Sequence, residues 1–233
     1  MQGERTMKTE VVASLLERIE PVGFATRSRF SGVLNAKVMD RVEQLVVALL
    51  YALLFWRLLP DSLDSVHRFG LMILVSEGTV LAFVLLRRGT TDITLRPADW
   101  AVAFGGTLPP LLVEIGSTSF LPVVGFGLIT VGWILHLSAK LTLRRSFGVV
   151  AANRGLKTSG IYALVRHPMY LGYFISHVGL ILAVPSFWNL FVYAVTWTCL
   201  IARIGAEERV LAKEAEYQAY QTTVRYRLIP WLW

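Results

Sequence analysis

Six long apolar stretches, separated by short polar segments, dominate the pattern of this chain. They cover about residues 42–59, 67–86, 98–116, 119–139, 169–184 and 187–204. A helix needs about 20 predominantly apolar residues to cross the hydrocarbon core of a bilayer. The pattern therefore predicts an all-α integral membrane protein with about six transmembrane helices.

The last two stretches are predicted to form a helical hairpin. The fifth stretch is short, and Pro185-Ser186 separates it from the sixth. Proline suits this turn because it cannot continue the helix that it follows. A polar tail comes after the hairpin, and residues 11–19 are compatible with an amphipathic helix on the membrane surface.

Composition agrees with a membrane environment. The chain is 55% hydrophobic and only 17% charged, whereas soluble domains average about 25% charged residues. The single cysteine, Cys199, excludes an internal disulfide framework and a multi-cysteine metal site. No close carboxylate–histidine cluster accompanies His136 or His177, so we expect no metal site and a packing role for both histidines.

The basic residues predict the orientation. With the six predicted spans, 21 of the 23 lysines and arginines fall on one side, and only Arg57 and Arg68 lie near the other. The positive-inside rule then places both termini in the cytoplasm. We attribute the net charge of +7 to topology and anionic lipid headgroups, and we expect no nucleic-acid partner.

A polar motif, Gly160–Gly172, lies between two apolar stretches and carries Arg166, His167 and Tyr170. Ionisable groups close to a bilayer are costly and usually functional. Pro168 biases His167 away from helical geometry, so a new helix is predicted to begin there. The free N–H groups and positive dipole of such a helix end suit a carboxylate or another polar ligand group.

A second polar motif ends the last apolar stretch. Arg203 and Glu207 are four residues apart and share one helix face, with Glu208 beside them. An interfacial salt bridge is the simplest interpretation. However, adjacent carboxylates point in different directions and one arginine cannot pair with both. A spare carboxylate near a basic, aromatic loop indicates a site for a cation-bearing ligand.

The connector at 140–168 is the longest segment between predicted spans. It carries six basic residues and no acidic residue, and Asn153-Arg154-Gly155 and Thr158-Ser159-Gly160 predict turns within it. Taken alone, it is compatible with a plain basic cytoplasmic loop. Its position directly before the polar motif favours a part in the same site.

The two motifs together resemble a known family. The string from Leu156 through Gly172 resembles the signature of isoprenylcysteine carboxyl methyltransferases, their bacterial relatives and the phospholipid N-methyltransferases. The tail, with Glu207-Glu208-Arg209 and then Glu216-Tyr217, is similar to that family as well. The resemblance covers about residues 120–231. It implies an integral membrane, S-adenosylmethionine-dependent methyltransferase without a Rossmann fold, whose connector and tail close a cofactor pocket at the cytoplasmic face.

The predicted spans and their orientation make residues 1–41 a cytoplasmic segment and 42–118 the N-terminal transmembrane helices. The resemblance makes 119–233 the methyltransferase core, and it also implies a set of site residues. The backbone of Leu156 and Lys157 would contact the cofactor, the pocket would be lined by Tyr162, His167, Pro168, Met169 and Tyr170, and Glu207, with Glu208 beside it, would bind the cofactor's positive charge. Arg203 would hold the carboxylate of the acceptor, so Arg203 and Glu207 are the expected catalytic pair. Gly125-Phe126-Gly127 either corresponds to the Gly-x-Gly element of the phospholipid enzymes or permits close helix packing.

Position 161 departs from the family, with isoleucine where many relatives have proline, and the tail is about two residues shorter. The expected acceptor is lipid-like or of the prenylcysteine type. The alternatives are a phospholipid N-methyltransferase or small-thiol S-methyltransferase of the same fold, an NADPH-dependent sterol-type reductase, and a non-catalytic membrane scaffold or transporter. Six spans and Glu207-Glu208 argue against the reductase, and the lack of an inverted repeat argues against a transporter. The acceptor and the oligomeric state stay open.

Overall fold

The computed structural model describes residues 22–62, 68–114 and 121–233. Its helices are α2 (Val22–Ser62), α3 (Arg68–Leu86), α4 (Pro97–Gly105), α5 (Pro122–Leu143), α6 (Pro168–Ala183), α7 (Phe187–Leu211) and α8 (Ala215–Thr223), with the 3-10 turns η1 (Pro109–Leu112), η2 (Arg144–Ser146) and η3 (Gly160–Ala163). Within these ranges the only β-type pairing is an isolated bridge between Ile93 and Ala152. The all-α prediction is confirmed. The predicted surface helix at 11–19 lies outside the described residues.

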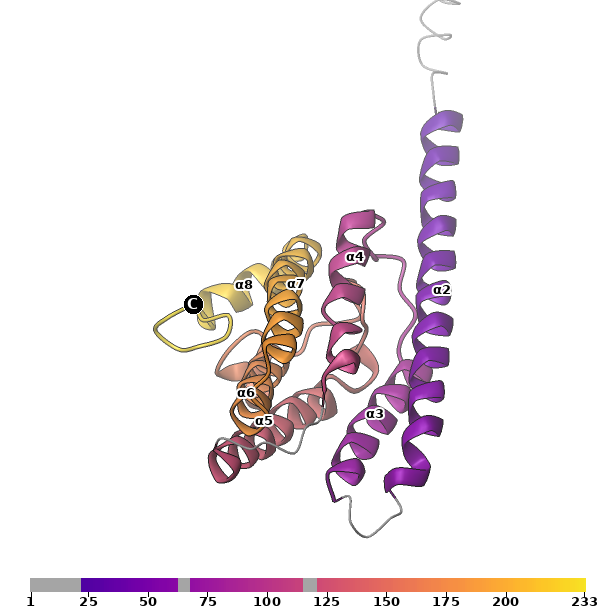
Figure 1. Ribbon diagram of the computed structural model, residues 1–233. Coiled ribbons are helices and arrows are strands. Elements are labelled where there is room, and N and C mark those ends of the chain that lie inside the picture. The colour runs from indigo at the N-terminus through magenta and orange to yellow at the C-terminus, as the bar shows by residue number, and fades with distance from the viewer. Residues whose placement is uncertain (1–21, 63–67, 115–120) are drawn as a thin grey trace, which may run out of the picture.

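The helices form two groups, which contact each other where α3 packs against α5. In Figure 1, the long α2 and the shorter α3 run side by side at one edge of the molecule, and α5, α6 and α7 form the other group. Helix α4 packs against α7, and α8 follows α7 close to the C-terminus. The start of α2 and the end of α7 point to the same side of the molecule (Figure 1).

Glycines allow α5 and α6 to pack closely. A Cβ atom at Gly125 would lie 2.7 Å from the Gly179 carbonyl oxygen, and one at Gly132 would lie 2.5 Å from the Gly172 carbonyl oxygen. The two glycines on each helix are seven residues apart, about two turns, so both pairs lie on one seam. Small residues at such a seam let backbones approach, as in membrane helix pairs. Gly125 therefore has a packing role. For Gly127, two residues further on, a Cβ would have no neighbour within 4 Å among the described residues.

The predicted hairpin turn between the fifth and sixth stretches is present. Helix α6 ends at Ala183, and α7 begins at Phe187 after Ser186, whose side chain accepts a hydrogen bond from the Trp188 N–H. The packing differs from the prediction, because α6 packs mainly against α5 across the glycine seam rather than against α7.

The prediction of one continuous helix over 98–116 is wrong. Helix α4 ends at Gly105, and the 3-10 turn η1 follows at Pro109–Leu112. Neither Pro109 nor Pro110 has a backbone N–H, so a regular helix cannot run through them. The nine residues of α4 rise only about 14 Å, which is about half of the hydrocarbon core.

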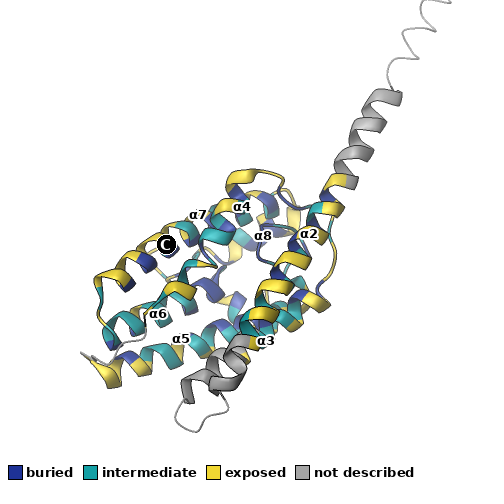
Figure 2. Ribbon diagram, turned by 45° about the vertical axis from the view of Figure 1, so that its right-hand side comes forward, coloured by how far each residue is buried: buried dark blue, intermediate teal, exposed yellow. Residues whose placement is uncertain are grey.

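Large apolar side chains are exposed along several helices. On α2, Leu45, Leu49, Leu53 and Trp56 are all more than half exposed, and Phe187 at the start of α7 is 95% exposed. Figure 2 shows such exposed positions in yellow along α2 and at the start of α5. In the described part of the chain, two helical segments, Pro122–Ser146 and Phe187–Leu211, are long and apolar enough to cross a membrane, and most of each is not buried. Exposed apolar faces of this extent fit contact with lipid.

Candidate functional site

Two neighbouring cavities lie where the connector, α6 and α7 meet. The first, called here the polar cavity, has a volume of about 100 Å³. It is lined by the connector (including Val150, Ala152, Arg154, Leu156 and Lys157), by η3 and the start of α6 (Tyr162, Arg166, His167, Met169 and Tyr170), and by the end of the chain (Glu207, Leu211, Tyr217 and Tyr220). The two polar motifs of the sequence therefore meet at one cavity.

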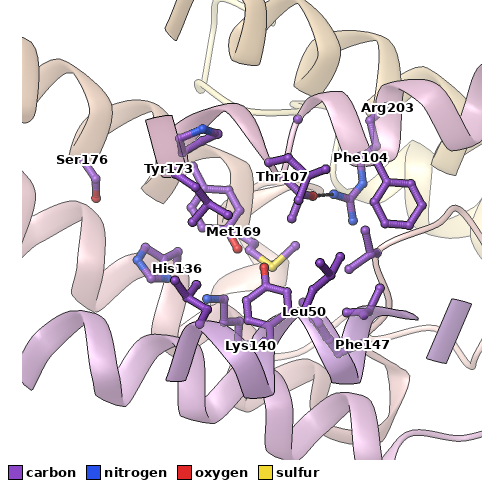
Figure 3. Close-up of a pocket in the computed structure, with 18 of the residues that line it drawn as sticks. Leu50, Phe104, Thr107, His136, Lys140, Phe147, Met169, Tyr173, Ser176 and Arg203 are labelled. Carbon is purple, nitrogen blue, oxygen red and sulfur yellow. Dashed lines mark hydrogen bonds between the residues drawn. The ribbon is translucent and has the colours of Figure 1, made fainter. Parts of the chain in front are cut away.

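The second, called here the apolar cavity, has a volume of about 220 Å³. It is lined by α2 (Val47, Leu50, Tyr51 and Leu54), by α4 and the turn after it (including Phe104, Thr107 and Leu111), by α5 (His136 and Lys140), by α6 (Met169, Tyr173, Ser176 and His177), and by Arg203 of α7. In Figure 3 the Arg203 guanidinium points toward Thr107, while His136 and Lys140 lie on the other side of the view. Met169 lines both cavities, so they adjoin one another.

Glu207 and Arg203 lie on one face of α7 and join the two cavities. Arg203 Nε donates to Glu207 Oε1 at 3.2 Å, and the Tyr170 hydroxyl donates to the same oxygen. The other oxygen, Oε2, lies 3.8 Å from His167 Nδ1, beyond hydrogen-bonding distance. Within the described part of the chain Glu207 therefore keeps one carboxylate oxygen without a hydrogen bond.

The Arg203 guanidinium is held on several sides. Its Nη2 donates to the Gly148 carbonyl oxygen at 3.1 Å, and its Nη1 lies 3.5 Å from Thr107 Oγ1. Its central carbon is 5.4 Å from the centre of the Tyr170 ring, a cation–π distance. The residue is 4% exposed. Arg203 is thus a buried, fixed cation at the edge of the apolar cavity.

Glu208 lines neither cavity and joins the polar motif to the tail. It accepts from Arg166 Nε at 3.0 Å and lies 2.8 Å from Arg227 Nη2 and 3.2 Å from His167 Nε2. The hydrogen bond to Glu208 raises the pKa of Arg227, so this pair stays ionised at neutral pH. Glu208 positions His167 and the tail.

The tail closes over the polar cavity through backbone contacts as well. The Arg166 and His167 N–H groups donate to the Tyr226 and Arg227 carbonyl oxygens at 2.9 and 2.8 Å. The Tyr220 hydroxyl donates to the Tyr162 carbonyl oxygen at 2.6 Å. Burial raises the pKa of Tyr220 to about 12, so its hydroxyl remains a donor at neutral pH.

The start of α6 has the predicted geometry. His167 caps the helix with a non-helical backbone (φ −127°, ψ 56°), and Pro168 occupies the first turn. The Tyr170 N–H is already bonded to the His167 carbonyl oxygen at 3.1 Å. The expected anion site at this helix end is therefore partly satisfied by the chain itself.

Tyr217, one of the residues that line the polar cavity, has an unpaired hydroxyl in the described part of the chain. The Tyr217 hydroxyl is buried, and within the described residues it makes no hydrogen bond. Buried polar atoms are normally paired, and an unpaired one requires an explanation. A bound ligand with a polar group would provide the missing partner.

Residues 120–217 match the phospholipid methyltransferase family. The resemblance predicted from the two motifs is confirmed, and its predicted start at about residue 120 agrees with the match.

Two relatives of known name are similar to the chain. The protein-S-isoprenylcysteine O-methyltransferase of Schizosaccharomyces pombe is 34% identical over 106 residues, which make up 42% of this chain and 45% of that protein. The chain thus spans less than half of the length of that curated relative. The solved structure of the eukaryotic intramembrane Ras methyltransferase ICMT (isoprenylcysteine carboxyl methyltransferase) aligns with a TM-score of 0.46 at 22% identity, covering 97% of this chain and 93% of that one.

Most of the predicted site residues come together in the structure. Seven of the nine predicted cofactor residues line the polar cavity: Leu156, Lys157, Tyr162, His167, Met169, Tyr170 and Glu207. The other two, Pro168 and Glu208, are buried but do not line it. Arg203, predicted to bind the acceptor, lines the apolar cavity.

Sequence reasoning missed several lining residues. Tyr217 and Tyr220 stand in the tail motif, which was a visible signal. His136 was expected only to pack, but it lines the apolar cavity, and within the described residues its buried Nδ1 has no hydrogen-bond partner. The sequence around His136 gave no local signal of this cavity-lining role, because four other helices form the rest of the cavity.

Proposed function

We propose that this chain is a membrane-embedded methyltransferase that takes a methyl group from S-adenosylmethionine and transfers it to an anionic, lipid-like acceptor of the prenylcysteine type. The observation that carries this proposal is the Arg203–Glu207 pair. The two residues are ion-paired on one helix face, yet the cation lines the apolar cavity and the carboxylate lines the polar one. One face of α7 thus offers opposite charges to two adjacent ligands.

The residues of the polar cavity fit the chemistry of S-adenosylmethionine. Glu207 keeps one oxygen for a positively charged group, and the rings of Tyr162 and Tyr170 add cation–π attraction. The buried Tyr217 hydroxyl, which makes no hydrogen bond within the described residues, could bond to a polar group of the cofactor. When bound, the cofactor supplies an electrophilic methyl group carried by a positively charged sulfur. Leu156 and Lys157, together with the lining residues of the polar motif, would hold it.

The polar cavity is small for the proposed cofactor. Its volume of about 100 Å³ is below the roughly 300 Å³ at which ligand pockets begin. Binding of a nucleoside-sized cofactor therefore requires the tail over the cavity to move outward. The tail is held in place by the Tyr220–Tyr162 hydrogen bond, by the ion pairs of Glu208, and by the backbone hydrogen bonds of Arg166 and His167.

The apolar cavity suits an anionic amphiphile. None of its lining residues in the described part of the chain is acidic, whereas Arg203 and Lys140 are basic. Apolar side chains from α2, α4 and α6 would accommodate a hydrocarbon chain. Arg203 can orient a carboxylate with its planar fork of donors.

This chain would act mainly by alignment. A carboxylate nucleophile needs little acid–base assistance to attack a methyl group, so the protein holds the two reactants in line and excludes water. Arg203 and Glu207 are four residues apart and therefore about 6 Å apart along the helix. This spacing would set the distance between the acceptor carboxylate and the positive charge of the cofactor. We place this site at the cytoplasmic face, on the side that carries most of the basic residues.

Calorimetric titration of the detergent-purified chain tests the cofactor class. We expect S-adenosylmethionine to bind and NADPH to give no heat of binding. Binding of NADPH alone would support the sterol-type reductase, and binding of neither would contradict the proposal.

The match to the phospholipid methyltransferase family makes a phospholipid amine the second candidate acceptor. The lack of acidic residues among the described lining of the apolar cavity disfavours a cationic acceptor. An activity screen across prenylcysteines, phospholipid amines and small thiols distinguishes the three acceptor classes.

A further inference from the structure

Four buried charged residues form a cluster beside the two cavities, and of the four only Arg154 lines one of them. Asp40 and Glu43 come from α2, Arg87 follows α3, and Arg154 belongs to the connector. Arg154 Nη2 lies 2.7 Å from Asp40 Oδ1 and 3.0 Å from Glu43 Oε2. Arg87 Nη2 lies 2.9 Å from Asp40 Oδ1, and Arg87 also pairs with Glu43. All four residues are at most 6% exposed.

The second oxygen of Glu43 binds the connector backbone directly. Glu43 Oε1 accepts hydrogen bonds from the N–H groups of Val149 and Val150 at 2.9 and 3.2 Å. One α2 carboxylate therefore holds two successive connector amides with one oxygen and the guanidinium of Arg154 with the other.

The connector segment held in this way is the partition between the cavities. Phe147 and Val149 line the apolar cavity, whereas Gly148 and Val150 line the polar one. Side chains that alternate between two sides are expected of an extended segment. The Gly148 carbonyl oxygen in this segment also accepts the hydrogen bond from Arg203. A shift of the partition would therefore move a wall of both cavities, and with it the Arg203 guanidinium.

We propose that Glu43 is a positioning residue for methyl transfer, acting with Asp40 through Arg154 and the Val149–Val150 amides to fix the partition and, through Gly148, Arg203. This role rests on the proposed function. It assigns a task in the reaction to α2, which lies wholly outside the segment that matches the methyltransferase family.

Two different substitutions disturb the partition. In Glu43→Gln the amide presents one acceptor and one donor, so it cannot accept from both the connector amides and the two arginines. Gly148→Ala leaves the carboxylates intact but places a Cβ 2.3 Å from Arg154 Nη1 and 2.7 Å from its central carbon. Arg154 is buried and fixed by the cluster, so we expect the partition to move. Asp92→Asn is the matched control, since it breaks the more exposed Asp92–Lys213 pair of the adjoining segment.

The test combines hydrogen exchange with kinetics on the full chain in detergent. For Glu43→Gln and Gly148→Ala we expect faster exchange confined to about residues 147–151, with α5 and α6 as protected as in the wild type. At saturating S-adenosylmethionine and S-prenylcysteine, methyl transfer per folded molecule should fall about tenfold or more, as expected for misaligned reactants. Asp92→Asn should stay within about twofold, as expected for a surface pair.

Transfer rates of folded Glu43→Gln and Gly148→Ala equal to that of the wild type would overturn the positioning role, as would unchanged exchange at 147–151. If Glu43→Gln does not fold, Gly148→Ala carries the test. A wild-type chain that binds no S-adenosylmethionine would refute the proposed function instead, while the exchange measurement would still report on the partition.

Discussion

Arg203 and Glu207 are ion-paired at 3.2 Å between Nε and Oε1, yet their side chains line different cavities. The pair is therefore more than a salt bridge that ends a membrane helix. Arg203 keeps N–H donors that Glu207 does not use, and Glu207 keeps one carboxylate oxygen that Arg203 does not use. We therefore expect substitutions of Glu207 to affect mainly the cofactor, and substitutions of Arg203 to affect mainly the acceptor.

Glu207→Gln should weaken the binding of S-adenosylmethionine and keep the fold. The amide can still accept from Tyr170 but lacks the negative charge. Because a hydrogen bond to a charged group contributes about 1.5–3 kcal/mol, we expect the dissociation constant to rise about tenfold or more. Calorimetry measures it, with Glu216→Gln on the exposed face of α8 as the control. Equal affinities of Glu207→Gln and the wild type would remove Glu207 from the cofactor site.

Arg203→Lys should affect the acceptor more than the cofactor. Lysine keeps the charge but cannot reproduce the planar fork that contacts Gly148, Glu207 and an acceptor carboxylate together. We expect the KM for a prenylcysteine to rise about tenfold, which corresponds to about 1.4 kcal/mol. Steady-state kinetics and calorimetry measure the two constants. A loss of cofactor affinity as large as the rise in KM would contradict the acceptor role.

Gly172→Ala should destabilise the α5–α6 seam. A Cβ there would lie 2.6 Å from the His136 backbone nitrogen, and such overpacking typically costs about 1–3 kcal/mol. Gly127→Ala is the matched control, because nothing lies within 4 Å of its Cβ. Alanine is preferred to glycine in helices by about 1 kcal/mol, so this control should be neutral or stabilising. Thermal unfolding in detergent compares them, and equal midpoints for both variants would refute the seam.

Tyr220→Phe should loosen the tail and alter the dependence of stability on pH. It removes the hydroxyl that donates to the Tyr162 carbonyl oxygen, a loss of about 1 kcal/mol. Burial raises the pKa of Tyr220 from 10 to about 12, so the folded state favours the protonated hydroxyl. Its stabilising contribution is complete below pH 10 and is lost as the pH rises from 10 to about 12. The unfolding midpoint should fall less steeply over this range in Tyr220→Phe, and identical slopes would contradict the assignment.

Local chemistry predicted the backbone features of the candidate site, whereas the family resemblance supplied most of its residues. The His167-Pro168 step marks a helix start, and the predicted turns contain Gly155 and Gly160, both with positive φ (98° and 63°). The spacing of Arg203 and Glu207 placed them on one face. These features depend on neighbouring residues, so a sequence displays them directly.

The features that were missed depend on partners far apart in the chain. Glu43 and Arg154 have no local signal that they pair, and the two oxygens of Glu208 find partners in both the polar motif and the tail. The break after α4 is a different case. Pro109-Pro110 is a visible signal of a helix break, but the prediction followed the continuous apolar pattern instead. Hydrophobicity indicates burial or lipid contact, and it does not by itself define a continuous helix.

Transfer of a labelled methyl group tests the central claim most directly. The purified chain, reconstituted in lipid, is incubated with S-adenosylmethionine labelled on its methyl group and with an S-prenylcysteine whose amine is blocked. We predict a base-labile methyl ester on the prenylcysteine, formed by the wild type. At cofactor and acceptor concentrations below their wild-type KM, it should be strongly reduced in both Glu207→Gln and Arg203→Lys. Absence of labelled ester from the wild type, with S-adenosylmethionine bound and the acceptor saturating, would contradict carboxyl methylation as the reaction of this protein.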